Sequence, residues 1–155
     1  MNYDSEEILE EIDFPWLIFK LNNNLYTLCS KMITSIVMIP DEITFVPNVK
    51  EYIIGLIHLR GNVVPLIDLN GLLKIETINN LSTKENKMVV VLEKENTFAG
   101  LIVDEVQSVE SITPFEETEE IRKMCRDGFV KGVAKGNKNE DVLLIIDEEK
   151  IMNLA

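Results

Sequence analysis

The sequence predicts a mostly β protein made of two related halves, in which short strands close into small barrels. Three observations favour this fold class. The strands are short and frequent, Asn and Gly turns separate them, and a pattern in residues 52–73 returns in weaker form in residues 129–152. Closing each sheet would remove exposed strand edges, and two barrels joined side by side would present a groove between them.

The first half of the chain begins with a predicted hairpin. Residues 16–21 (WLIFKL) and 25–28 flank the turn Asn22-Asn23-Asn24, whose side chains tolerate left-handed backbone geometry. Residues 31–39 form a further β-rich stretch, which stops at Pro40-Asp41. Pro65 cannot donate a backbone hydrogen bond, so we expect it on an edge strand or at a bulge.

The second half follows a polar connector at residues 76–87. Two strands are expected around residues 94–96, from Met88 to Glu93 and from Phe98 to Val109. Charges at helical spacing and good helix formers in residues 116–126 predict a short helix that bridges to the second copy of the repeat. At the amino terminus, residues 4–12 could form an acidic helical turn or a frayed end.

The repeat consists of an aromatic residue, a glycine three positions later, an Ile-Asp pair and a short apolar turn. The first copy has Tyr52, Gly55 and Ile67-Asp68, and the second has Phe129, Gly132 and Ile146-Asp147. The Gly-to-Asp interval is longer in the second copy, a difference that a surface hairpin can absorb. Chance similarity between two hairpins is the alternative, because repeats this short are easily matched by accident.

Length and charge limit the classes of function. A chain of 155 residues with 46% hydrophobic content can bury about 70% of its unfolded surface in one compact domain. Its apolar runs are far shorter than the ~20 residues of a membrane-spanning helix, and the acidic first 13 residues lack the features of a secretory signal. We therefore expect a cytoplasmic protein without direct membrane insertion. The net charge of −12, with scattered basic residues, argues against nucleic acid and anionic lipid as partners.

Candidate catalytic residues are few. His58 is the only histidine, and it lies in an alternating apolar strand where a packed or pocket-lining side chain is the commoner case. Asp68, Asp104 and Glu105 could act as paired carboxylates, but their separation in the sequence disfavours acid–base chemistry. Metal-ligand spacings and glycine-rich phosphate loops are missing from the sequence. We expect no catalytic residue, no metal and no cofactor.

One string favours protein binding. In Leu59-Arg60-Gly61, Gly61 allows left-handed backbone geometry at the apex of a hairpin, and Arg60 would hold a rigid fork of five donors near the surface. Such a group suits recognition of a carboxylate on another protein. An ordinary solvated loop arginine is the alternative.

The string IGLIHLRGNVVPLIDL, from Ile54 to Leu69, resembles the hairpin of the CheW-type chemotaxis coupling proteins and of the regulatory domain of CheA histidine kinases. The resemblance continues in AGLIVDEV, from Ala99 to Val106, and in Tyr26-Thr27-Leu28. It covers nearly everything from about Phe14 onward. It implies a single CheW-like domain over residues 14–155 after an acidic, flexible segment at residues 1–13.

The resemblance implies two SH3-like five-stranded barrels with short helices. The first would comprise roughly residues 22–86, and the second roughly residues 14–21 with 87–155. It also implies a non-catalytic adaptor, recruited to membrane-bound receptor arrays. The first barrel would dock on the regulatory domain of a CheA-type kinase, and the groove would take the cytoplasmic tip of a methyl-accepting chemoreceptor.

The resemblance also assigns roles to individual residues. Contacts with partner proteins are implied for Arg60, Ile33, Ser35, Ile36, His58, Val103 and Val109. Structural roles fall to Gly55, Gly61, Pro65, Asp68, Gly100 and Gly132, of which Gly55, Gly61 and Pro65 would shape the loop that holds Arg60. Two of the contact positions depart from the family, because His58 replaces the usual Asn and Ser35 stands where an acidic residue is common.

An exposed apolar strip made of Ile33, Ile36, Val37 and Ile39 would be useful on a docking face. Two other classes of function make different predictions. An enzyme requires a deep pocket with converging titratable groups. A free-standing regulatory or ligand-binding barrel of another signalling pathway requires an enclosed apolar cavity rather than a shallow groove.

Overall fold

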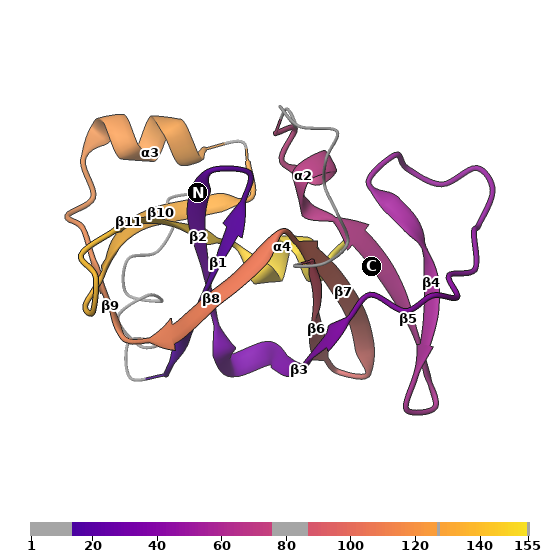
Figure 1. The fold of residues 1–155 in the computed structure, drawn as a ribbon. Coiled ribbons are helices and arrows are strands. Elements are labelled where there is room, and N and C mark those ends of the chain that lie inside the picture. Colours follow the sequence, from indigo (N-terminus) through magenta and orange to yellow (C-terminus); the bar gives the residue numbers. More distant parts are fainter. Residues whose placement is uncertain (1–13, 76–86, 127, 155) are drawn as a thin grey trace.

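The computed structural model describes residues 14–75, 87–126 and 128–154 (Figure 1). In chain order the strands are β1 Trp16–Leu21, β2 Asn24–Cys29, β3 Ile33–Met38, β4 Ile53–Leu59, β5 Asn62–Asp68, β6 Met88–Lys94, β7 Thr97–Val103, β8 Glu105–Glu110, β9 Ile112–Pro114, β10 Val130–Gly136 and β11 Val142–Ile146. The helices are the 3-10 turn η1 Ser30–Met32 and the α-helices α2 Leu69–Leu72, α3 Glu119–Cys125 and α4 Glu148–Met152.

The strands form two sheets that lie side by side (Figure 1). One sheet has the order β8-β1-β2-β11-β10-β9, and the other has the order β3-β6-β7-β5-β4. The mostly β fold with two sheets and few helices is confirmed. The expectation of two closed five-stranded barrels needs correction, because one sheet has six strands and neither strand order returns to its first strand. Each half is therefore a curled, open sheet.

The sheets divide the chain differently from the expected subdomain limits. Strand β2 belongs to the six-stranded sheet, whereas β6 and β7 belong to the five-stranded sheet. The reason is pairing: β11 lies parallel to β2, and β5 lies parallel to β7. The second strand of each repeat copy thus extends a hairpin made by another part of the chain. Strand β11 extends the β1–β2 hairpin, and β5 extends the β6–β7 hairpin.

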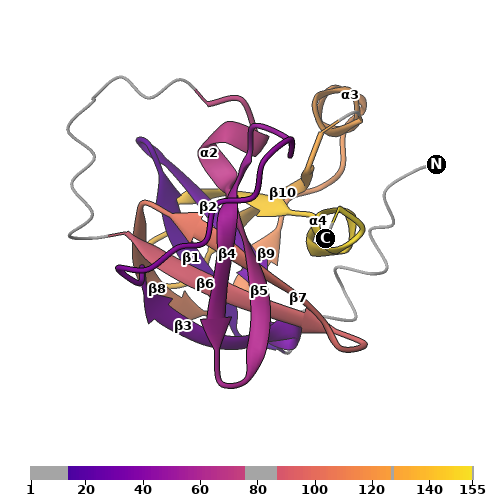
Figure 2. The ribbon, with the colours of Figure 1, turned by 90° about the vertical axis from the view of Figure 1, so that its right-hand side faces the viewer.

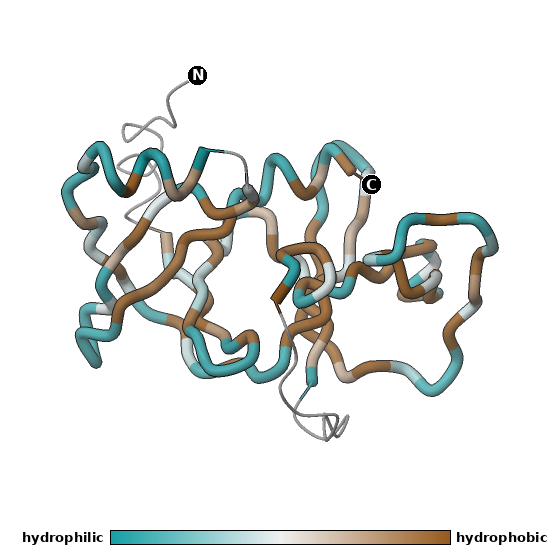
Figure 3. The backbone as a smooth tube through the Cα atoms, turned by 90° about the horizontal axis from the view of Figure 1, so that it is seen from above, coloured by the Kyte–Doolittle hydropathy of each residue, from teal (hydrophilic) through white to brown (hydrophobic). Residues whose placement is uncertain are grey.

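Three apolar clusters hold the sheets. The largest lies between them and takes side chains from both, including Phe19, Leu28, Leu92, Leu101 and Ile146. A second lies within the curl of the six-stranded sheet, around Trp16. A third lies within the curl of the five-stranded sheet, around Val64. Figure 3 shows hydrophobic strands running through the middle of the chain. The central cluster makes the two halves one body, because neither sheet could bury that face alone.

The internal repeat is confirmed in detail. In both copies the ladder has an irregularity just before the glycine, between Ile53 and Gly55 and between Val130 and Gly132. The Asp68 N–H donates to the Tyr52 carbonyl at 2.8 Å, and the Asp147 N–H donates to the Phe129 carbonyl at 2.7 Å. Each aspartate then stands at the N-cap of a short helix, α2 or α4. The extra length of the second copy lies in its turn, as expected, because Asn137 to Asp141 replaces Arg60-Gly61.

Pro65 was expected on an edge strand or at a bulge. The edge strand is wrong, because β5 lies between β7 and β4, and the irregularity of the β4–β5 ladder lies one pair away, where Gly55 faces Leu66. The partner of Pro65 in β4 is Leu56, whose N–H and carbonyl are hydrogen-bonded to Thr44 on the opposite side. The nitrogen of Pro65 therefore faces away from β4, and the parallel ladder with β7 begins only at Leu66. A missing N–H at this position breaks no ladder hydrogen bond.

The remaining expectations for local structure fare as follows. The first hairpin is confirmed, with Asn22 in the left-handed region at φ 58°. The bridging helix is confirmed as α3, in which the Thr118 hydroxyl caps the N–H of Ile121 at 3.2 Å. The expectations for residues 1–13 and for the connector at 76–86 lie outside the described residues.

Candidate protein-binding surface

The Arg60-Gly61 turn lies at the tip of the β4–β5 hairpin, which projects beyond the neighbouring strands (Figure 2). Both residues are left-handed, with φ 50° at Arg60 and 84° at Gly61. Two-residue turns of this kind match the twist of the strands that they join. Gly61 adopts this geometry without cost, whereas an arginine in it is uncommon. The exposed Arg60 therefore stands on a tightly defined turn, as expected.

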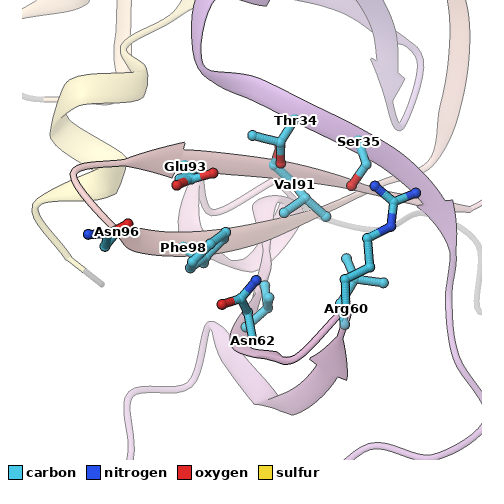
Figure 4. A pocket seen from close by; sticks show the side chains of 10 residues that line it. Thr34, Ser35, Arg60, Asn62, Val91, Glu93, Asn96 and Phe98 are labelled. Atoms are coloured by element: carbon cyan, nitrogen blue, oxygen red, sulfur yellow. The ribbon is translucent and has the colours of Figure 1, made fainter.

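A hollow of about 310 Å³ opens beside this turn. Residues of all five strands of the five-stranded sheet line it, so it is the mouth around which that sheet curls. In Figure 4, Arg60 extends from the hairpin tip toward Ser35 on β3. The structure thus brings together Arg60 and Ser35, two of the residues implied in partner contacts.

Strand β3 alternates between half-buried and exposed side chains. Ile33 packs against the central cluster, and Val37 and Ile39 pack against the cluster inside the five-stranded sheet. The expected apolar strip of four residues is therefore wrong, and Ile36 alone of the four is exposed, at 36%. Its outward neighbour is Met38, 76% exposed, which the sequence analysis missed although the alternation of the strand contains it.

Val103 and Val109 have opposite environments. Val103 is fully buried in the central cluster, so the expected contact with a partner needs correction: its side chain faces the core. Val109, on β8, is 58% exposed. It lies opposite the buried Leu17 in the β1–β8 register, and so it sits at the margin of the core-facing side of its sheet.

Ile36 has the matching position on the other sheet. It lies opposite Val90, a member of the central cluster, and β3 is an edge strand. Strand β8 is likewise the edge strand of its sheet, so each of the two sheets has an edge strand that borders the central cluster. Exposed apolar side chains from the two edge strands, Ile36 and Met38 on β3 and Val109 on β8, therefore flank the seam where the sheets meet. We call these three residues the seam residues.

His58 is exposed, which corrects the expectation of a packed or pocket-lining side chain. It pairs across the hairpin with Val63, which is 60% exposed and was missed by the sequence analysis. Phe45, 76% exposed in the segment between β3 and β4, was also missed. Nothing in the sequence distinguished Val63 and Phe45 from core residues, because only packing decides which apolar side chains stay exposed.

Two of the structural glycines act by their lack of a side chain. A Cβ on Gly55 would lie 2.5 Å from the Thr44 carbonyl oxygen, so Gly55 admits the segment that bridges to Leu56 and does not shape the Arg60 loop directly. A Cβ on Gly100 would lie 2.8 Å from Val89. Gly132 adjoins the irregularity in the β10–β11 ladder.

Two of the three candidate acid–base carboxylates, Asp104 and Asp68, serve the fold, whereas Glu105 accepts an exposed hydrogen bond from Gln107 at 3.0 Å. Asp104 accepts hydrogen bonds from the Asn22 N–H at 2.6 Å and from the Asn70 amide at 2.9 Å. Asp68 stands at the N-cap of α2. In the described parts of the chain, no three His, Cys, Asp or Glu side chains gather as a metal site would require. Burial raises the pKa of the Tyr26 hydroxyl and of the Cys125 thiol, and a hydrogen bond with Glu149 raises the pKa of Lys94; these three groups line neither the hollow nor the seam.

A comparison with family models matches residues 15–155 to the CheW-like domain. This chain belongs to the CheW-like domain family. It is 29% identical to the chemotaxis protein CheW of Klebsiella aerogenes over 146 residues, which covers 93% of this chain and 84% of that protein. It is 27% identical to the CheW of Bacillus subtilis, covering 88% of this chain and 85% of that protein.

A solved structure extends the likeness to three dimensions. The scaffolding protein TtCheW from Thermoanaerobacter tengcongensis superposes with a TM-score of 0.67 at 29% identity, covering 86% of this chain and 83% of that one. The SH3-like description of the two halves therefore holds, with the open sheets described above. These likenesses support a role as a chemotaxis adaptor or scaffold. The helices of the described residues are all too short or too polar to cross a membrane.

Proposed function

We propose that this CheW-like protein is a non-catalytic adaptor that couples transmembrane chemoreceptors to a CheA-type histidine kinase by binding both proteins. The observation that carries the proposal is the set of seam residues, exposed and apolar at the junction of two sheets. Exposed apolar side chains at the margin of a shared core favour protein contact, because burying them is favourable by about 25 cal/mol per Å². Localisation in the cytoplasm, at membrane-bound receptor arrays, follows from this role.

The two partners would use neighbouring surfaces. The regulatory domain of the kinase would dock on the five-stranded sheet near Arg60, Ser35 and Ile36. The tip of a methyl-accepting chemoreceptor would lie along the seam and contact Val109. Apolar side chains would supply the central contacts, and the Arg60 guanidinium would pair with a carboxylate at the rim, as is usual in protein interfaces.

The charge distribution of the chain favours a local attraction at Arg60 over a general attraction to an acidic partner. The net charge of −12 makes a strongly acidic partner surface unfavourable overall. Arg60 supplies a local positive group on a rigid turn, and so it would fix the orientation of a partner carboxylate. A charge of this kind at a rim changes specificity and association rate more than affinity.

The test is a calorimetric titration of the protein with the regulatory domain of the CheA-type kinase and, separately, with a receptor fragment containing the cytoplasmic tip. We expect saturable binding of both. Ile36→Glu should weaken kinase binding, and Val109→Glu should weaken receptor binding, each by at least about tenfold, because each places a charge in an apolar contact.

Matched controls come from the same chain. Val142 is 62% exposed, far from the seam on β11, and Val142→Glu should bind both partners normally. Arg126, exposed at the end of α3, is the control for Arg60→Glu. A folded protein that binds neither partner would overturn the proposal, and equal losses in the control variants would remove its assignment to these surfaces.

A further inference from the structure

The hollow in the five-stranded sheet carries opposite charges at its two ends. Figure 4 shows Glu93 and Asn96 at one end and Arg60 with Ser35 at the other. Glu93 comes from the end of β6, and Arg60 comes from the tip of the β4–β5 hairpin. Two distant segments of the chain therefore place an anion and a cation across one cavity.

Neither charge is neutralised by another residue that the structure describes. Among the described residues, the Arg60 guanidinium and the Glu93 carboxylate have no ion pair or hydrogen bond. By contrast, the adjacent Lys94 is hydrogen-bonded to Glu149 on α4. Glu93 is half-buried and lies opposite Phe98 in the β6–β7 register, so its carboxylate is on the inner face of the sheet. A half-buried carboxylate there gains from a cationic ligand, because burial makes an unpaired charge costly.

Between the two charges the hollow is lined by the half-buried Phe98 and by Thr34, with Val64 and Val91 fully buried behind them. Phe98 and Val91 lie between the ends of the hollow in Figure 4, and Val64 also lines it. Val64 and Val91 belong to the cluster inside the sheet, against which Phe98 packs. The half-buried Phe98 offers an apolar surface to the body of a ligand. The volume of about 310 Å³ is that of a small-molecule site.

We propose that this hollow binds a small zwitterion, in which a carboxylate and an ammonium group are separated by an apolar body. The carboxylate binds Arg60, assisted by the Ser35 hydroxyl, and the ammonium binds Glu93, assisted by the Asn96 amide. The ligand body covers Phe98. This binding goes beyond the adaptor role and shares only its Arg60 end with the kinase-docking surface, so an occupied hollow would compete with a partner carboxylate for that arginine.

The test uses a series of straight-chain ω-amino acids as a ruler: 4-aminobutyrate, 6-aminohexanoate and 8-aminooctanoate. Each is titrated into the 15N-labelled full chain while the amide resonances are followed. One length should give saturable shifts, at millimolar concentration or below, in residues 34–35, 59–64 and 91–98. Hexanoate and hexylamine, which carry one charge each, should bind about tenfold more weakly or less.

Charge-neutral variants assign the two ends. Arg60→Gln and Glu93→Gln should each weaken binding of the best ω-amino acid by about tenfold, and hexanoate should lose its remaining affinity only in Arg60→Gln. Glu95→Gln is the matched control, because Glu95 lies two residues further along, in the β6–β7 turn, without lining the hollow. Arg126→Gln is the control for Arg60. Both controls should leave the affinity unchanged within about twofold.

Three results would overturn the inference. The first is the absence of saturable shifts at every chain length up to about 50 mM. The second is equal binding of hexanoate and of the ω-amino acids. The third is binding only of a longer peptide that carries an acidic and a basic side chain, which would make the hollow a docking socket for a partner protein. Kinase titrations are independent, since ligand binding without kinase binding would leave this inference standing and remove the adaptor role.

Discussion

The Asp104 carboxylate accepts a 2.6 Å hydrogen bond from the backbone N–H of Asn22, which ties the turn of the β1–β2 hairpin to the chain segment that joins the two sheets. Its other oxygen accepts from the Asn70 amide on α2 at 2.9 Å and lies 3.7 Å from the Lys87 ammonium. One carboxylate thus connects three segments that are distant in sequence. It therefore links the two sheets to each other.

Removing this carboxylate should destabilise the protein. Asp104→Ala should lower the free energy of unfolding by about 2–3 kcal/mol, because it leaves the Asn22 N–H and the Asn70 amide without their charged acceptor. Urea denaturation followed by circular dichroism measures the change. Asp41→Ala, at an exposed position, is the control and should change stability by less than about 0.5 kcal/mol. Equal effects of the two variants would show that Asp104 does not hold the sheets together.

The buried ion pair between Lys131 and Glu148 should be costly to the stability of the protein when only one partner is removed. Their charged atoms are 3.6 Å apart, and both side chains are 3% exposed. Lys131→Met or Glu148→Leu alone should cost about 3–5 kcal/mol, because each leaves a buried charge, and the double variant should cost less than the sum. The pair Lys135–Glu140 is also 3.6 Å apart but solvent-exposed, so Lys135→Met should cost less than about 1 kcal/mol in the same urea series. Additive losses in the double variant would contradict this account.

Gly55 should not tolerate a methyl group. Gly55→Ala should cost about 1–3 kcal/mol, because the new Cβ would lie 2.5 Å from the Thr44 oxygen and 2.7 Å from Ile43. Thermal unfolding of the variant measures the loss. Gly128→Ala serves for comparison, since its Cβ would have no neighbour closer than 4.0 Å. A Gly55→Ala protein as stable as Gly128→Ala would mean that the bridge from Thr44 to Leu56 moves without cost.

Substitution by alanine should lower stability at Val103 but weaken partner binding at Val109. Val103→Ala should cost about 2 kcal/mol of stability, because it removes buried methyl groups and leaves a cavity in the central cluster. Val109→Ala should change stability by less than about 0.5 kcal/mol but weaken binding of the receptor tip. Unfolding and titration on both variants decide this. Weaker receptor binding by folded Val103→Ala alone would restore the contact that the sequence comparison implied.

Stability should fall at alkaline pH through Tyr26. Burial raises the pKa of the Tyr26 hydroxyl above its ordinary value, and a hydrogen bond with the Asn24 side chain partly opposes the shift. The unfolded chain releases this proton first, at about pH 10, so the contribution of Tyr26 is complete below that pH and disappears as pH rises through the folded pKa. In urea unfolding at pH values from about 8 to about 11, the decline should be smaller in Tyr26→Phe than in the unsubstituted protein. Identical declines would refute the role of Tyr26.

Local structure was largely predictable from the sequence. The turn at Asn22, the helix at α3 and the left-handed Gly61 depend on short-range backbone preferences, so their residues reveal them. The repeat was also visible, because both copies need the same glycine and aspartate for the same irregular ladder and helix cap. Family resemblance added Arg60, whose position at a hairpin tip the structure confirms.

The site was less predictable, because exposure depends on what the rest of the chain covers. Val103 and Val109 are both valines in neighbouring strands, yet the central cluster buries one and leaves the other at its margin. Ile36 and Val37 differ in the same way, by the side of β3 on which each lies. Arg60 and Glu93 line opposite ends of one hollow although they belong to different hairpins, and no spacing in the sequence predicts this.

By itself, the sequence determined the β class, the two-fold internal repeat, the main turns and the resemblance to CheW-type proteins, because these follow from residue periodicity, backbone preference and motif. Only the tertiary structure decided that the sheets stay open and which apolar side chains reach solvent. It also decided that β2 joins the six-stranded sheet and that β6 and β7 join the five-stranded sheet. The physical reason is that strand pairing and burial are set by contacts between distant segments, whose free energies no local pattern contains.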